Sequence, residues 1–404
     1  ALRDRRAEFA ALSAPADAAD LPEPDALYLA LRRFKRRLLL GDSQIDFERM
    51  VCVDVGYSSD GHQTLHRNAA QSPVGGRLLV LDGLGPDAGV RKLAPQDGTP
   101  SGFWRPDVSY DGEKILFCMK PGVAGTFHLY EVNVDGTGLR QITRGTYDDL
   151  DPVYAPDGGI VFSTTRCNQF LPCGGSNYRM FILARCNTVG KEIYFLSANN
   201  ECDYLPAFLP DGRLLFTRWE YYDKSVSRVQ SLWTCNPDGT GISAVWGNQS
   251  KWPDILWNAH PIPGTNRILF NSGGHHDAFS GSLGVVDRNE GMNYPDGLYA
   301  MTPRVPWVEV GRGPEDHVLN PNFQPPTCYV GYQSPFPIGK DLFLVSARTG
   351  ASPNIRSETD LRGHRLYLMD YDGNMEQLYA GTYNVLYAQP IRPRPRPPVL
   401  ASSV

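Results

Sequence analysis

The sequence predicts an all-β protein, specifically a six-bladed β-propeller, and three observations support this prediction. A four-strand pattern recurs along the chain, Asp-Gly turns separate its strands, and strand-like segments without partners stand at both ends. The chain is also rich in turn-forming residues, with 40 Gly and 33 Pro among its 404 residues. Four short strands per repeat are typical of a propeller blade.

Each repeat opens with an X-Pro pair and a short strand, followed by an Asp-Gly turn and an apolar strand. Asp-Gly supplies the positive φ angles that tight connections between strands need. The X-Pro pairs are 46 to 69 residues apart, more than the roughly 40–45 residues of an ordinary blade, so enlarged loops are expected. The clearest copies are RPDVSYDGEKILFCM (105–119), DPVYAPDGGIVFST (151–164) and LPAFLPDGRLLFTR (205–218), and two less regular copies are HPIPGTNRILFNS (260–272) and NPNFQPPTCYVGYQ (320–333).

The two ends of the chain are expected to complete one blade together. The segment 49–95 contains three strand patterns but lacks a first strand, and almost no chain follows the last X-Pro pair, Gln389-Pro390. A C-terminal strand paired with the N-terminal strands would close the ring and protect its edges. The competing interpretation, two β-sandwiches, explains neither the recurring X-Pro pairs nor the unpaired strands at the ends.

The segments that flank the propeller are predicted to differ from it. Residues 25–40 carry apolar side chains at helical spacing and a basic cluster between Arg32 and Arg37. A solvated helix packed on the propeller rim is favoured over a membrane-surface or partner-binding helix. The Pro-rich tail is expected to be extended. The predicted domains are a helical extension (1–47), the propeller (48–392) and the tail (393–404).

Composition and charge exclude several classes of protein. The formal net charge of −5 offers no bulk attraction to nucleic acid, so no nucleic-acid partner is expected. No apolar run approaches the ~20 residues that cross a bilayer, so no transmembrane segment is expected. The chain begins without an initiator Met or a signal-type apolar stretch, which favours a soluble, processed or trimmed product.

The eight cysteines are too few for a disulfide scaffold, so any bridge would be a local staple. Cys167 and Cys173 form one candidate disulfide, and Cys186 and Cys202 form the other, given an exported protein. Buried free thiols or a metal site are the alternatives. No CxxCH motif occurs, which excludes the ordinary attachment site for c-type haem.

Functional residues are expected on one face of the ring. In a blade, the connection that enters the first strand and the loop after the second strand lie on the same face, and binding sites favour long loops on a rigid scaffold. The X-Pro residues Arg105, Asp151, Leu205, His260, Asn320 and Gln389 are expected to ring the central channel. The candidate binding residues are Asp151, Arg166, Arg218, Trp219, Glu220, His260, His275 and His276.

The chemistry of these candidates leaves alternatives open. Arginines recognise anions, whereas Trp219 with Tyr221 and Tyr222 offers stacking surface for a small molecule or glycan. The arginines are about equally compatible with loop-ordering hydrogen bonds to carbonyls. Cys167, His275 and His276 are the candidate ligands of zinc or another transition metal, although a hydrogen-bonded structural role is favoured for the histidines. Neither a GxSxG elbow nor a Gly-rich phosphate loop is present.

Several motifs, in this order along the chain, resemble a known family. They are LRRFKRRLLLGDSQIDFERMVCV (31–53), STTRCNQFLPCGG (163–175), LPDGRLLFTRWEY (209–221), SGGHH (272–276) and PIRPRPRPP (390–398). The repeat resembles that of TolB-type propellers over residues 100–380, and the motifs resemble the alpha subunit of hydrazine synthase and its relatives.

The resemblance implies a propeller in an exported bacterial protein, periplasmic or extracellular, that assembles with other subunits. It also implies c-type haems and a zinc, but the missing CxxCH motif removes the haem, and only Cys167 corresponds to a residue near the catalytic centre of that family. The first hypothesis is therefore a haem-free binding or assembly module that uses the long-loop face. The alternative is a metal-dependent or redox enzyme that uses the same face.

Overall fold

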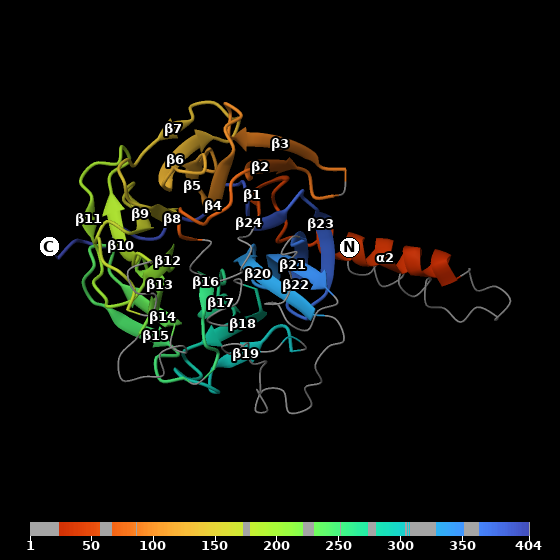
Figure 1. Cartoon of the computed structure of the whole chain (residues 1–404). Helices are drawn as coiled ribbons and strands as arrows, with labels where there is room; N and C mark the ends of the chain where they lie inside the picture. Colours follow the sequence, from red (N-terminus) through yellow and green to blue (C-terminus); the bar gives the residue numbers. More distant parts are fainter. Residues whose placement is uncertain are drawn as a thin grey trace.

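The computed structural model is a ring of six four-stranded antiparallel sheets around a central channel (Figure 1). This arrangement confirms the predicted six-bladed propeller. The structure describes residues 24–56, 67–85, 87–172, 178–220, 230–250, 252–273, 280–303, 305, 307, 329–350 and 363–403.

The clearest sequence repeats form blades 2, 3 and 4. Their apolar strands are buried on both faces because neighbouring blades cover them, as in β5 and β9. Blade 1 contains β24 (Asn384–Pro390), β1 (Arg49–Val55), β2 (Arg77–Asp82) and β3 (Gly89–Ala94). Blade 2 contains β4 (Ser101–Val108), β5 (Lys114–Pro121), β6 (His128–Asn133) and β7 (Arg140–Gln141). Blade 3 contains β8 (Asp149–Tyr154), β9 (Ile160–Thr164), β10 (Ile182–Cys186) and β11 (Tyr194–Phe195).

The remaining three blades have the same strand order from the channel outward. Blade 4 contains β12 (Asp203–Phe208), β13 (Leu214–Trp219), β14 (Gln230–Cys235) and β15 (Ser243–Trp246). Blade 5 contains β16 (Trp257–Pro261), β17 (Arg267–Ser272), β18 (Ser282–Asp287) and β19 (Leu298–Ala300). Blade 6 contains β20 (Tyr329–Pro337), β21 (Leu342–Gly350), β22 (Arg365–Asp370) and β23 (Met375–Tyr379).

The two ends of the chain close the ring in blade 1, as predicted. The C-terminal strand β24 pairs antiparallel with β1, and Met50 lies opposite Pro390 and Val53 opposite Leu386. The sheet order β24-β1-β2-β3 makes the C-terminal strand the innermost strand of a blade otherwise built from the N-terminal region. Each described inner strand therefore pairs with the second strand of its own blade.

A β-bulge recurs in all six inner strands. At each bulge the pairing register shifts and one non-glycine residue has a positive φ angle. The bulge changes the direction in which that side chain points. All six side chains are buried. The bulge residues are Arg105, Asp151, Leu205, Asn258, Ser334 and Tyr387.

The bulges correct two of the predicted ring positions. Arg105, Asp151 and Leu205 are bulge residues, as their X-Pro pairs predicted. His260 and Gln389 each lie two residues beyond the bulge of their strand, so they sit further along the channel. Asn320 lies outside the described residues, and the inner strand of blade 6 begins only at Tyr329. An X-Pro pair marks the bulge only where its first residue is itself the bulge residue. This holds in the first three repeats and in Ser334-Pro335.

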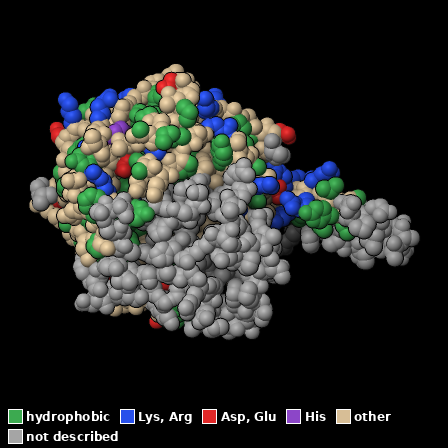
Figure 2. Space-filling view, in the orientation of Figure 1, with side chains coloured by type: hydrophobic (Ala, Val, Ile, Leu, Met, Phe, Trp, Pro, Cys, Tyr) green, Lys and Arg blue, Asp and Glu red, His purple; other side chains and the backbone are tan. Residues whose placement is uncertain are grey.

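The helix α2 (Pro24–Leu40) joins the rim of the ring through its C-terminal half. Phe34 and Leu39 are buried, and Arg36 donates to the Glu376 carboxylate at 2.6 Å. The N-terminal half extends away from the propeller, and basic side chains gather along the helix (Figure 2). Packing on the rim thus accounts for only half of the helix. No helix in the described part of the chain has both the length and the apolar character needed to cross a membrane.

The C-terminal strap, residues 391–403, runs across the face of the propeller that carries the turns between the first and second strands of the blades. Arg394 donates to both oxygens of the Asp107 carboxylate at 2.9 and 2.8 Å, and the Ser403 N–H donates to Asp238 at 2.6 Å. Gly112, with φ of +77°, admits the strap closely, because a Cβ there would lie 2.7 Å from the carbonyl carbon of Arg392. The strap thus connects blades 1, 2 and 4.

Candidate functional site

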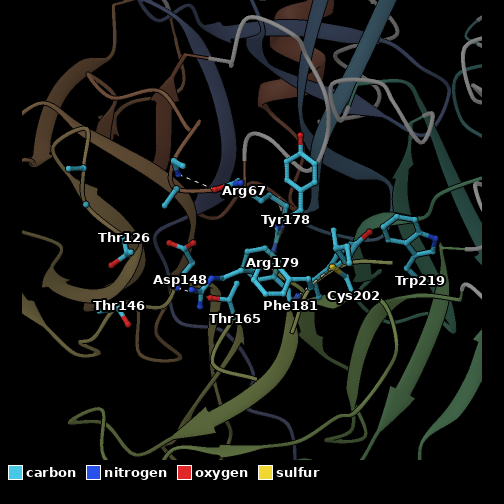
Figure 3. A pocket seen from close by; sticks show the side chains of 18 of the residues that line it. Arg67, Thr126, Thr146, Asp148, Thr165, Tyr178, Arg179, Phe181, Cys202 and Trp219 are labelled. Carbon is cyan, nitrogen blue, oxygen red and sulfur yellow. Dashed lines mark hydrogen bonds between the residues drawn. The ribbon is translucent and has the colours of Figure 1, made fainter. Parts of the chain in front are cut away.

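A cavity of about 570 Å³, here called the mouth pocket, opens at one end of the central channel. It lies on the face formed by the loops between the second and third strands of the blades and by the connections between blades. This is the face on which binding residues were expected. Figure 3 shows Asp148, Thr126, Thr146 and Thr165 on one side of the pocket and Phe181, Cys202 and Trp219 towards the other. The lining residues come from blades 1 to 5: Arg67, Asn68, Ala69, Ala70, Val123, Ala124, Gly125, Thr126, Thr146, Asp148, Thr165, Phe170, Leu171, Tyr178, Arg179, Phe181, Cys202, Tyr204, Trp219 and Trp257.

Arg67 reaches from the pocket into the channel and pairs with Asp151. Its two terminal nitrogens donate to the two carboxylate oxygens, one at 3.0 Å and the other in a shorter contact. The guanidinium also lies over the rings of Phe181 and Tyr204, at 5.0 and 5.2 Å from their centroids. Burial would raise the pKa of Asp151, but Arg67 and Arg105 outweigh it and hold that pKa below its ordinary value. The positive charge of Arg67, which lines the pocket, is therefore matched by Asp151 in the inner strand of blade 3.

Asp148 is the carboxylate that faces the pocket. Its Oδ1 accepts a hydrogen bond from the Phe127 N–H at 2.9 Å, and its own N–H donates to the Thr165 hydroxyl. Burial, together with the negative charge of Asp149, raises the pKa of Asp148 to about 6, although hydrogen bonds from the backbone oppose the shift. Perturbed titratable groups in clefts are characteristic of functional sites.

A buried lysine fixes the loop that carries Arg67. The Lys120 ammonium on β5 donates to the carbonyl oxygens of Ala69 and Ser72, at 2.5 and 2.7 Å. The side chain is only 1% exposed. This tie between blades 1 and 2 holds the segment 67–72 over the channel and shapes one wall of the mouth pocket.

Arg166 and Arg218, predicted as possible anion binders, make equivalent contacts in blades 3 and 4, although Arg218 lies within β13 and Arg166 follows β9. Arg166 forms two hydrogen bonds with the Asp149 carboxylate at 2.9 and 2.7 Å, and Arg218 does the same with Asp203 at 2.8 Å each. Each also donates to a backbone carbonyl of the connection before the inner strand. Neither lines the mouth pocket. These contacts correspond to the loop-ordering alternative.

Other candidates divide between the two faces of the ring. Trp219 is buried and lines the mouth pocket, whereas Glu220 is buried beside the Ser231 hydroxyl at 3.4 Å. His260 lines a separate cavity of about 510 Å³ at the opposite end of the channel, next to Phe336 and the strap. Burial, then the charges of Arg105 and Arg394, lower the pKa of His260 well below its ordinary value. Among the described lining residues, His260 therefore belongs to this second cavity and not to the mouth pocket.

The predicted metal ligands are only partly described by the structure. His275 and His276 lie outside the described residues, as do Tyr221 and Tyr222. The Cys167 thiol is half-buried, with a pKa raised by burial, and it donates to the Met180 carbonyl at 3.5 Å. Within the described ranges, no three His, Cys, Asp or Glu side chains form a group that would hold a metal ion.

The expected disulfide between Cys186 and Cys202 is absent, and both residues carry free thiols. The Cys202 sulfur accepts the Phe181 N–H at the start of β10, whereas Cys186 ends the same strand five residues later. Five residues of strand span about 16 Å, beyond the reach of a disulfide. Cys167 is also free, and its predicted partner Cys173 lies outside the described residues.

Sequence reasoning missed the two charged residues that define the pocket, Arg67 and Asp148. Asp149 and Asp203 both stand two residues before an X-Pro pair, and each binds an arginine at or just after the end of the next strand, so this repeated pattern is architectural. Asp148 has no acidic counterpart in blade 4, where Cys202 occupies the equivalent position. A carboxylate that breaks the repeat was the available signal. Arg67 lies in a segment without a repeat counterpart and left no such signal.

Together, the fold and the pocket define a class: a six-bladed β-propeller closed by both chain ends, with a ligand-sized pocket at one mouth of its channel. Two solved structures share this fold. Hydrazine synthase from Kuenenia stuttgartiensis matches with a TM-score of 0.64 and 16% identity over 88% of this chain and 48% of that chain. TolB from Acinetobacter baumannii matches with a TM-score of 0.52 and 14% identity over 91% of this chain and 73% of that chain.

These similarities establish a TolB-like propeller fold that also occurs in hydrazine synthase. This chain spans about half the length of the hydrazine synthase chain that it matches. No family model matches the sequence, and no curated protein matches it.

Proposed function

We propose that this chain is an extracytoplasmic binding and assembly module that receives its ligand, or a protruding group of a partner, in the mouth pocket. The observation that carries this proposal is the pocket itself, which combines aromatic walls with a few convergent polar groups on the long-loop face. Pockets of about 300–1,000 Å³ with this composition are typical of ligand sites. The rigid ring positions the loops, and the loops supply the recognition groups.

The fold similarity supports the proposed setting. Both TolB and hydrazine synthase contain a propeller of this kind, and in hydrazine synthase it forms only part of a longer chain. We therefore propose that this propeller works beside other domains or subunits in the periplasm or outside the cell. Cell fractionation of the native host tests the location, because the proposal requires the protein in the extracytoplasmic fraction.

An enzyme that uses the same face is the second candidate, and Asp148 is the observation that favours it. A buried carboxyl group with a pKa near 6 suits general acid–base catalysis near neutral pH. The metal-dependent form of this candidate depends on His275 and His276. Elemental analysis tests it directly: stoichiometric zinc, copper or iron that is lost in His276→Ala supports the metal enzyme, and equal metal content in the two proteins contradicts it.

The binding proposal is tested by a fragment screen with a matched pair of variants. Ala124 is exposed and lines the pocket, so Ala124→Trp fills the space without disturbing the core. Ala26→Trp places the same side chain on exposed helix α2, outside the pocket. We expect saturation-transfer NMR to detect aromatic fragments that bind wild type and Ala26→Trp but not Ala124→Trp. If no fragment shows this pattern, the mouth pocket is not a binding site.

A further inference from the structure

We propose that the mouth pocket selects an organic cation: a ligand whose ammonium group contacts Asp148 and whose apolar body extends towards the rings of Phe181 and Trp219. This inference rests on the proposed function, because it names the chemical class that the same pocket binds. It depends on two features of the described pocket wall: the carboxylate of Asp148 and the position of the aromatic rings.

Asp148 is the acidic group of the described pocket wall, and its carboxylate accepts hydrogen bonds from the backbone. Asp148 is the one carboxylate among the described lining residues, and it forms no ion pair within the described chain. The positive charge of Arg67 is matched by Asp151. Arg179 is exposed at the rim, where it donates to Asn168 at 3.0 Å and lies over the Tyr147 ring. Asp148 is therefore the acidic side chain that the described wall offers to a bound cation.

The groups around Asp148 offset its charge only in part. The Lys120 ammonium attracts the Asp148 carboxylate, but it donates its hydrogen bonds to two backbone carbonyls, and Asp149 adds a second negative charge nearby. His128 lies in the same region, with its Nδ1 3.8 Å from an Asp149 carboxylate oxygen. An ammonium group in the pocket would meet the Asp148 carboxylate without displacing any ion pair within the described residues.

The aromatic rings provide a surface that already binds a cation. Phe181 and Tyr204 hold the guanidinium of Arg67 over their faces, and ring faces attract positive charge in this way. Phe170 is 47% exposed and Tyr178 is half-buried, so both present ring surface to the open part of the pocket. Figure 3 places Asp148 with three threonines on one side of the pocket and Trp219 on the other. An elongated ligand with one charged end and one apolar end fits this layout.

Three indole probes that differ in charge test the inference on the full chain. Tryptamine is a cation, tryptophol is neutral and indole-3-acetate is an anion, while all three share the same ring. Titration calorimetry at pH 7.5 should show tryptamine binding at least about tenfold more tightly than tryptophol, with indole-3-acetate the weakest, as expected for one charged contact. Asp148→Asn should remove the preference for tryptamine. Asp97→Asn, which removes an exposed carboxylate from the blade 1–2 connection, should retain it.

The outcomes separate this inference from the function on which it rests. If tryptophol binds as tightly as tryptamine, or if Asp148→Asn keeps the preference, the cation proposal is wrong even though the pocket binds ligands. If none of the three probes binds, or if binding survives in Ala124→Trp, the mouth pocket is not the site and both proposals fail.

Discussion

Arg67 and Asp151 form a buried bidentate ion pair across the channel, although 84 residues separate them in the sequence. Arg67 belongs to the long loop of blade 1, and Asp151 is the bulge residue in the inner strand of blade 3. The Ser163 hydroxyl donates to the same carboxylate at 2.7 Å. This ion pair connects the loop that shapes the mouth pocket to an inner strand of the ring. It therefore holds the loop in position on the scaffold.

Breaking this pair should destabilise the protein strongly. Arg67→Met leaves the Asp151 carboxylate buried without its main countercharge, and such a change costs about 3–5 kcal/mol. Arg213→Met serves as the control, because it breaks an exposed pair with Asp211 and should cost less than about 1 kcal/mol. Urea denaturation of both variants measures the difference. Equal losses would show that the buried pair does not hold the loop.

The stability of the protein should respond to the titration of Asp148. Because its folded pKa, about 6, exceeds its ordinary value of 3.8, the folded state binds the proton more tightly than the unfolded state does. Wild type should therefore lose stability relative to Asp148→Asn as the pH rises from 4 to 6, by up to about 3 kcal/mol. Asn still offers an oxygen to the Phe127 N–H.

The measurement is the free energy of unfolding of both proteins between pH 4 and pH 8. Asp149, His128 and Lys120 remain in both, so the difference between the two curves isolates Asp148. Parallel curves across this range would mean that Asp148 is not perturbed by its surroundings.

The affinity for tryptamine should fall as Asp148 becomes protonated. With a pKa of about 6, roughly a tenth of the carboxyl groups are ionised at pH 5, so binding should weaken about tenfold between pH 7.5 and pH 5. The ligand ammonium itself stays charged in this range, as a lysine does. Calorimetric titrations at the two pH values test this, with tryptophol as the reference ligand. An equal pH effect on both ligands would contradict a role for Asp148.

The C-terminal strap should stabilise the ring through Arg394 rather than through Arg396. Arg394 binds Asp107 and the Val108 carbonyl and lies 4.6 Å from the Tyr110 ring centroid. Arg396 contacts only the same ring, at 5.3 Å, among the described residues. Arg394→Ala should therefore cost about 2 kcal/mol and Arg396→Ala below about 1 kcal/mol, measured as shifts in thermal unfolding. Similar shifts for both would mean that the strap binds only loosely.

The architecture was predictable from the sequence because it is built from repeated local signals. Asp-Gly turns, apolar runs and the incomplete blade at residues 49–95 are each readable without the structure, and their count gives six blades. The prediction failed where the repeat is irregular. In blades 1 and 5 the bulge residues are Tyr387 and Asn258, so the X-Pro pairs at Gln389 and His260 gave the wrong register.

The pocket was less predictable because it depends on loops that pack against other blades. Arg166 and Arg218 carry the residue type of a ligand site, but their equivalent carboxylate partners make them part of the scaffold. Asp148 and Asp149 are adjacent in the sequence. Only the structure shows that Asp148 lines the pocket, whereas Asp149 binds Arg166. Side-chain chemistry alone does not distinguish these roles.

The most direct test of this account is a crystal structure of the protein soaked with tryptamine. We predict the indole ring in the mouth pocket beside Phe181 and Trp219, with the amine nitrogen within about 3.2 Å of an Asp148 carboxylate oxygen. Tryptamine bound elsewhere, or bound in the pocket with its amine directed away from Asp148, would contradict the account.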